Sequence, residues 1–229
     1  MGDFMIFTGT YAILETAGQR LALVIPPTPH EVCGEMDQAL PADRVGFLCS
    51  SVSGGNIRVE TLKGTADANL LRAAGFFYAR QQGTEGTSLV LTEGNGLPAP
   101  RAVVTNPAHQ TASAVLPLPE RLQVRETGAD AELDGILYHV TTENETFSDG
   151  VTVHLNPSDS SIDCPRAEAA AAAAIWLTRD MQDGTMELNI GVGEAVLEIG
   201  LRKIGGKVAG LSVGGEMRLL DVRVWELSV

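Results

Sequence analysis

A run of six alanines, residues 169–174, constrains this chain more than any other feature of its sequence. Alanine loses no side-chain rotamer freedom in a helix, so the segment around the run, DCPRAEAAAAAAIWLTRDM, is predicted to be helical. A helix that is apolar on all sides has to be covered by other elements in every direction. Strands wrapped around one such helix provide this cover, so the run predicts an α+β fold.

The residues before the alanine run place a thiol at the start of the predicted helix. Pro165 is expected in the first turn, where its missing N–H costs nothing, so Asp163 or Cys164 is expected at the N-cap. The positive end of the helix dipole favours the thiolate there, and the thiolate is the form that acts as nucleophile or base. Cys164 is therefore a candidate catalytic residue, and a small buried apolar side chain is the alternative interpretation.

The length, charge and cysteine content of the chain argue against several classes of function. Its 229 residues can form one large domain or two small ones. A net charge of -13 with scattered basic residues argues against nucleic acid and membrane surfaces as partners. The N-terminus has no basic region before its apolar stretch, so no secretory signal is predicted. Sparse cysteines and dispersed histidines lack metal-ligand spacing, so we expect no metal site and a reducing compartment, the cytoplasm.

Two stretches of the chain share one order of elements. Residues 57–91 and 151–190 each read as strand, polar turn, apolar helix, glycine and strand. Chance alternation in an α+β chain is the alternative, but in both stretches the longest helix of its half follows a polar turn. We therefore predict two similar halves, residues 1–125 and 126–229, with the chain end free to cross back to the first half. Each half is predicted to be a strongly curved mixed or antiparallel sheet, or a barrel, around a central apolar helix.

The predicted halves would face each other across a cleft, where small-molecule sites usually form. Both helix N-termini, near Asp67 and Cys164, are expected to point into this cleft and to bind an anionic group.

The strand, polar turn and buried helix of each half, with DCPRAEAAAAAAIW in the second, resemble the diaminopimelate epimerase fold, which proline racemases and the phenazine-biosynthesis isomerase share. The resemblance covers most of the chain and implies that a group at the start of each central helix acts as opposed acid and base on the α-carbon of an amino acid. It implies no pyridoxal phosphate, no metal and no other cofactor. It assigns the second catalytic position to Cys164, and it implies a small carboxylate or amino acid as ligand and a homodimer.

The sequence departs from the family pattern at both helix starts. The first motif, normally cysteine, glycine and asparagine, corresponds to DANLLRAAG, where Leu70 or a neighbour replaces the cysteine. Asp67 at the same helix start is the candidate carboxylate base, and an N-cap is its alternative role. Pro165 has no N–H to offer a substrate carboxylate. Arg166 is the candidate substrate-binding residue in its place, and a solvated side chain is the alternative.

Three hypotheses of function follow from these residues. The leading one is a cofactor-independent isomerase, either a racemase or epimerase or a proton-shifting isomerase, that acts on an amino acid or a related small carboxylate. The alternative is a catalytically silent epimerase-like protein kept for binding or scaffolding, which the loss of one catalytic arm favours. The third is a hydrolase that uses Cys164 with His139 or His154, but the flanking residues lack a nucleophile-elbow pattern.

Overall fold

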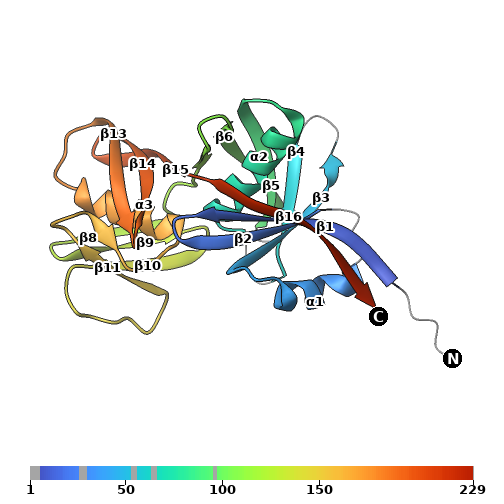
Figure 1. Cartoon of the computed structure of the whole chain (residues 1–229). Helices are drawn as coiled ribbons and strands as arrows, with labels where there is room; N and C mark the ends of the chain where they lie inside the picture. Colours follow the sequence, from blue (N-terminus) through green and yellow to red (C-terminus); the bar gives the residue numbers. More distant parts are fainter. Residues whose placement is uncertain (1–5, 26–29, 53–55, 63–65, 95–96, 229) are drawn as a thin grey trace. The chain divides into compact units, whose positions relative to one another are not determined.

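The computed structural model describes residues 6–25, 30–52, 56–62, 66–94 and 97–228 (Figure 1). The chain forms two compact units. Unit 1 takes in residues 1–66, 70–112 and 217–229, and unit 2 takes in residues 67–69 and 113–216. The end of the chain therefore returns to unit 1, and the start of one helix is part of unit 2. The division into halves at residues 125 and 126 stays a prediction.

Unit 1 is built from seven strands and two helices within its described residues. The strands lie in the order β16-β1-β2-β3-β4-β5-β6, and the pairs β2/β3 and β4/β5 are parallel. Each parallel pair is joined by a helix, as parallel strands require a crossover connection. The elements are β1 (Ile6–Thr16), β2 (Gln19–Ile25), α1 (His30–Ala39), β3 (Arg44–Val52), β4 (Asn56–Glu60), α2 (Ala68–Gln82), β5 (Gly86–Gly94), β6 (Leu97–Asn106) and β16 (Arg218–Ser228).

Unit 2 also contains two parallel strand pairs. Its strands lie in the order β15-β14-β13-β12-β11-β10-β9-β8, and the pairs β10/β11 and β12/β13 are parallel. A helix makes the second crossover, but a loop of residues 142–150 makes the first. The elements are β8 (Arg121–Arg125), β9 (Gly128–Leu133), β10 (Ile136–Thr141), β11 (Val151–Asn156), β12 (Ser161–Ile162), α3 (Ala167–Leu177), β13 (Gly184–Val192), β14 (Ala195–Ile204) and β15 (Lys207–Gly215). Strand β7 (Thr111–Val115) lies where the two units join in sequence, and it pairs with β15.

The sheet of unit 2 curves around α3. Residues 167–176 are all buried, and the helix contacts β9, β10, β11, β13, β14 and β15. Strands in a sheet lie roughly 4.8 Å apart, so a flat sheet would extend far beyond a helix about 10 Å wide. Six strands reach one helix only if the sheet bends around it, as the alanine run predicts. In the described part of the chain, no helix has the length and apolarity needed to cross a membrane.

The ends of α3 differ from those expected from the sequence. Arg166, with extended φ and ψ of -77° and 135°, is the N-cap, so the expected cap at Asp163 or Cys164 is wrong. Pro165 lies before the helix and not in its first turn, because its carbonyl accepts a hydrogen bond from the Asn69 side chain instead of an intrahelical one. A residue before proline also avoids helical backbone angles, which excludes Cys164 from the helix.

At the other end, α3 stops at Leu177, before the glycine that was expected to close it. The hydroxyl of Thr178 donates to the carbonyl of Ala174 at 2.9 Å. The buried ammonium of Lys203, on β14, donates to the carbonyl oxygens of Thr178 and Arg179. A cation at the negative end of the helix dipole satisfies carbonyls that have no intrahelical partner, and this ends the helix inside the core.

Enlarging one alanine of α3 tests the close fit of the sheet around it. Ala171 has no exposed surface, so Ala171→Leu has to displace its neighbours and is expected to lower the free energy of unfolding by about 1–3 kcal/mol. Urea denaturation followed by circular dichroism measures this. Ala108→Leu, at an exposed turn position, is the matched control and should change stability by less than about 0.5 kcal/mol. Equal effects of the two substitutions would contradict close packing.

Candidate functional site

The start of α2 is bound to the start of α3 within unit 2. The amide of Ala68, the first residue of α2, donates to Oε1 of Glu168 at 2.7 Å. The side-chain amide of Asn69 donates to the carbonyl of Pro165 at 3.2 Å. These two hydrogen bonds join residues that are about a hundred positions apart in sequence. They bring Asp67, which directly precedes α2, into the electrostatic field of Glu168.

Glu168 is a buried carboxyl group in an otherwise apolar helix. Its side chain is 2 % exposed, and Oε2 has no hydrogen-bond partner among the described residues. Burial first, and then the negative charge of Asp67, raise the pKa of Glu168 from its ordinary 4.5 to about 7, although the Ala68 amide opposes the rise. A carboxyl group with this pKa can donate or accept a proton near neutral pH, which is the property that acid/base chemistry needs.

Arg166 supplies a fixed positive charge beside these carboxyl groups. Burial alone would lower its pKa, but contact with the Tyr138 hydroxyl and the charges of Asp67 and Cys164 outweigh burial and raise the pKa. Tyr138 reaches this place from β10, and burial raises the pKa of its hydroxyl, which therefore stays neutral. A guanidinium group with neighbours of this kind can bind a carboxylate through paired hydrogen bonds.

Cys164 lies in the same cluster, but it does not have the reactivity expected from the sequence. Burial raises the pKa of its thiol, while the backbone N–H and the charge of Arg166 oppose the rise. The negative charges of Asp163 and Glu168 raise the pKa further. The expected lowering by the helix dipole is therefore wrong, because α3 begins only at Ala167 and the thiol is half-buried beside carboxylates. The thiol form predominates at neutral pH and can act as a proton donor.

The structure brings all three predicted site residues, Asp67, Cys164 and Arg166, into one cluster of unit 2. It adds Glu168 and Tyr138, which the sequence analysis missed. A signal for Glu168 was present, because it is the single charged residue in the run AEAAAAAAIW. Nothing in the sequence distinguished Tyr138 from other strand aromatics, because its contact with Arg166 joins a strand to a helix start that is distant in sequence.

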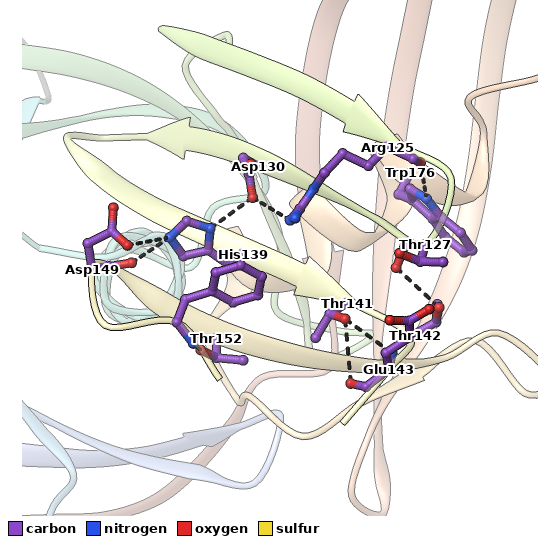
Figure 2. Close-up of polar contacts among 11 residues, drawn as sticks. Arg125, Thr127, Asp130, His139, Thr141, Thr142, Glu143, Asp149, Thr152 and Trp176 are labelled. Carbon is purple, nitrogen blue, oxygen red and sulfur yellow. Dashed lines mark hydrogen bonds and ion pairs between the residues drawn. The ribbon is translucent and has the colours of Figure 1, made fainter. Parts of the chain in front are cut away.

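The two histidines considered for a hydrolase are paired with aspartates instead of the thiol. The Nδ1 atom of His139 lies 2.8 Å from Oδ1 of Asp130 (Figure 2). The Nε2 atom of His154 lies 4.0 Å from Oδ2 of Asp163. Within the described residues neither imidazole forms a hydrogen bond with Cys164. The structure therefore gives the hydrolase hypothesis no base for its nucleophile.

His139 instead holds the loop of residues 142–150 against the sheet. Its Nε2 atom hydrogen-bonds with the carbonyl of Asp149, as Figure 2 shows, and its ring stacks on Phe147 with centroids 4.3 Å apart. The guanidinium of Arg125 bonds Asp130 at 2.7 Å and lies 5.2 Å from the Phe147 ring. This polar cluster covers the sheet at the crossover that a helix makes in unit 1, so we assign it a structural role.

The described residues contain no group of three histidine, cysteine or acidic side chains placed to hold a metal ion. The absence of a metal cofactor stays a prediction.

Comparison with known proteins identifies the fold. No family model and no curated protein matches the sequence. Among solved structures, a predicted epimerase from Pseudomonas aeruginosa matches with a TM-score of 0.69 and 12% identity, over 94% of this chain and 98% of that one. The chain has the diaminopimelate epimerase-like fold.

Two further solved structures match most of this chain. A phenazine biosynthesis protein of the PhzF family from Enterococcus faecalis matches with a TM-score of 0.64 and 15% identity, over 96% of this chain and 100% of that one. A hydroxyproline epimerase from Agrobacterium vitis, with bound trans-4-hydroxy-L-proline, matches with a TM-score of 0.64 and 10% identity, over 96% of this chain and 93% of that one. These identities establish the fold of the chain and leave its reaction to be argued from its own residues.

The titration of Glu168 has a testable effect on stability. Folded Glu168 keeps its proton up to about pH 7, whereas the unfolded chain loses it above the ordinary pKa of 4.5. The protonated carboxyl therefore contributes stability that is lost as the pH rises from 4.5 through about 7. Glu168→Gln cannot titrate and can still accept the Ala68 hydrogen bond. Its free energy of unfolding, relative to the unmodified chain, should rise over this pH range and then level off.

Chemical denaturation at a series of pH values measures this difference. Glu194→Gln, at an exposed position, is the control for the loss of one carboxyl group elsewhere on the chain. A flat profile for Glu168→Gln would show that Glu168 is ionised in the folded chain as it is in the unfolded one.

Proposed function

We propose that this protein is a cofactor-independent isomerase that moves a proton at the carbon next to the carboxylate of a small acid or amino acid. The observation that carries the proposal is the buried Glu168, whose pKa of about 7 lies close to neutral pH, beside Asp67, Cys164 and the guanidinium of Arg166. A buried carboxyl group that titrates near neutral pH can exchange protons with the substrate under ordinary conditions. The diaminopimelate epimerase-like fold supports the same class of reaction, since its solved members include epimerases and an isomerase.

Each residue of the site has a separate role in such a reaction. Arg166 binds the substrate carboxylate and balances the charge that develops on it. An ionised carboxylate, from Asp67 or Glu168, takes the proton from the adjacent carbon, and the electron pair of the broken C–H bond moves into the substrate carboxylate. The thiol of Cys164 then gives its proton to the carbon, which leaves a thiolate and a protonated carboxyl group on the protein. Proton exchange with solvent restores both groups.

The stereochemical result depends on where the thiol delivers its proton. Delivery to the opposite face of the same carbon gives racemisation or epimerisation, and delivery to a conjugated carbon gives a shift of a double bond. Similar solved structures represent both results, with a hydroxyproline epimerase and a methylitaconate-delta-isomerase. We propose small carboxylates of these two kinds as the substrates to examine, and the cytoplasm as the compartment.

A binding protein without catalysis is the second candidate. It is favoured by the raised pKa of the Cys164 thiol, which leaves little thiolate at neutral pH to act as a base in the reverse direction. Pro165, which has no N–H, also offers no backbone donor in the segment just before α3. This candidate predicts binding of small carboxylates with no exchange of their protons.

Exchange of substrate protons with solvent separates the two candidates. The protein is incubated in D2O with L-proline, trans-4-hydroxy-L-proline and a methylated unsaturated dicarboxylate, and deuterium at carbon is followed by NMR. We expect one class to incorporate deuterium, and we expect Glu168→Gln and Cys164→Ala to slow incorporation by about 10²-fold or more, since each removes a proton-transfer group. Glu194→Gln is the control and should leave the rate unchanged.

Binding of the same compounds is measured in parallel by calorimetry. A compound that binds tightly without incorporating deuterium would exclude catalysis on it and support the binding protein. Deuterium incorporation that persists in Glu168→Gln at the full rate would exclude Glu168 as the acid/base group, while leaving the class of reaction intact.

A further inference from the structure

A cavity of about 270 Å³ lies in unit 2 at the carboxyl end of α3. The 11 residues of α3 span about 16 Å, so the cavity is separate from the cluster of site residues at the start of that helix. Its volume is close to the lower limit for cavities that hold small ligands. Its apolar wall consists of Leu122 and Val124 on β8, Ile175 on α3 and Val208 on β15.

The ammonium group of Lys203 lines this cavity without a counter-ion. Lys203 is only 6 % exposed, and its Nζ atom donates to the carbonyl oxygens of Thr178 and Arg179. No carboxylate of the described chain lies within ion-pair distance of it. A buried charge is costly unless an opposite charge reaches it. An ammonium group has three N–H donors, so one donor is left for an anion in the cavity.

Arg179 brings a second cation to the same cavity. Its Nη1 atom donates to the carbonyl of Trp176 at 3.1 Å, and its guanidinium carbon lies 4.0 Å from the Trp176 ring. Its Nε atom lies 3.4 Å from Oδ2 of Asp180. These contacts fix the guanidinium group, while its Nη2 atom has no acceptor within the part of the chain that the structure describes. Nη2 is therefore a second donor for an anion.

The negative groups near the cavity are weaker than these two cations. The side chain of Asp180 is 87 % exposed, and Asp183 is exposed and accepts hydrogen bonds from the amides of Gly205 and Gly206. Water and salt screen exposed charges of this kind. The end of the α3 dipole carries about half a negative charge, which the Lys203 ammonium already balances. We therefore expect a net positive potential inside the cavity.

We propose that this cavity is a second ligand site, which binds a small monocarboxylate with a short apolar chain. The carboxylate accepts hydrogen bonds from the Lys203 ammonium and from Nη2 of Arg179. The apolar chain lies against Leu122 and Val124. A compound with several charges would place some of them against the apolar wall, which is costly, so a single charged group is the best match.

Hexanoate is the probe for this site, and amide chemical shifts of the ¹⁵N-labelled protein report its binding. We expect saturable shifts at the amides of Gly206 and Val208. Acetate keeps the charge and lacks the chain, 1-hexanol keeps the chain and lacks the charge, and hexylammonium reverses the charge. Each of the three should bind at least about tenfold more weakly than hexanoate.

Two variants test the cations. Lys203→Met and Arg179→Gln should each weaken hexanoate binding by at least about tenfold, because each removes a charge-assisted hydrogen bond. Arg202→Gln is the matched control, since Arg202 is exposed on β14 and faces the other side of the sheet from Lys203. It should leave the affinity unchanged. Circular dichroism verifies folding, and Arg179→Gln decides alone if Lys203→Met does not fold.

A further pair of variants tests the apolar wall. Leu122→Ala should weaken hexanoate binding by about threefold or more, because it removes apolar surface from the side of the ligand chain. Leu118→Ala is the control, since Leu118 has similar exposure and does not line the cavity. It should bind hexanoate as the unmodified chain does.

Three results would overturn the proposal. The first is the lack of a saturable shift up to about 10 mM hexanoate, where a site with a millimolar Kd would be nearly full. The second is equal binding of hexanoate and 1-hexanol, which would exclude a role for the cations. The third is a set of shifts confined to the amides around Arg166 and Glu168, which would place hexanoate at the start of α3. The titration needs no catalytic activity, so its failure leaves the proposed isomerase reaction unaffected.

Discussion

The burial of α3 on every side is the constraint on which the rest of unit 2 depends. A helix of alanines can be surrounded closely because its side chains end at Cβ, and six strands reach it. The closeness of the sheet leaves the first turn of the helix buried, and the one carboxyl group there is only 2 % exposed. Its raised pKa is thus a consequence of the same packing that stabilises the helix. The packing around α3 therefore also sets the acid/base behaviour of Glu168.

Two hydrogen bonds fasten the start of α2 to this buried position. One of them satisfies the Ala68 amide, which has no intrahelical acceptor, and one oxygen of Glu168. The other joins the Asn69 side chain to the carbonyl of Pro165. They also hold Asp67 where its charge opposes ionisation of Glu168. A helix start thereby becomes part of the compact unit that surrounds the other helix. The hydrogen bond from the Ala68 amide offsets part of the free-energy cost of burying the Glu168 carboxyl group. The rest of that cost appears as the raised pKa of Glu168.

The two units use different means to cover the same kind of sheet face. In unit 1, α1 packs on an apolar cluster that includes Val24, Phe47 and Trp225. In unit 2 a loop covers the sheet through an ionic and aromatic cluster centred on His139. Both units nevertheless contain two parallel strand pairs.

The sequence by itself predicted the helices and the α+β class, because alanine propensity and apolar periodicity are local properties of the chain. Its resemblance to the diaminopimelate epimerase fold agrees with the fold that the comparisons identify. The sequence also located Asp67, Cys164 and Arg166, which lie within a few residues of helix starts. It did not determine that α3 begins after Pro165, that Glu168 is buried or that the Cys164 thiol has a raised pKa. These depend on dehydration and on contacts between residues about a hundred positions apart, and only the tertiary structure decides which groups lose their water.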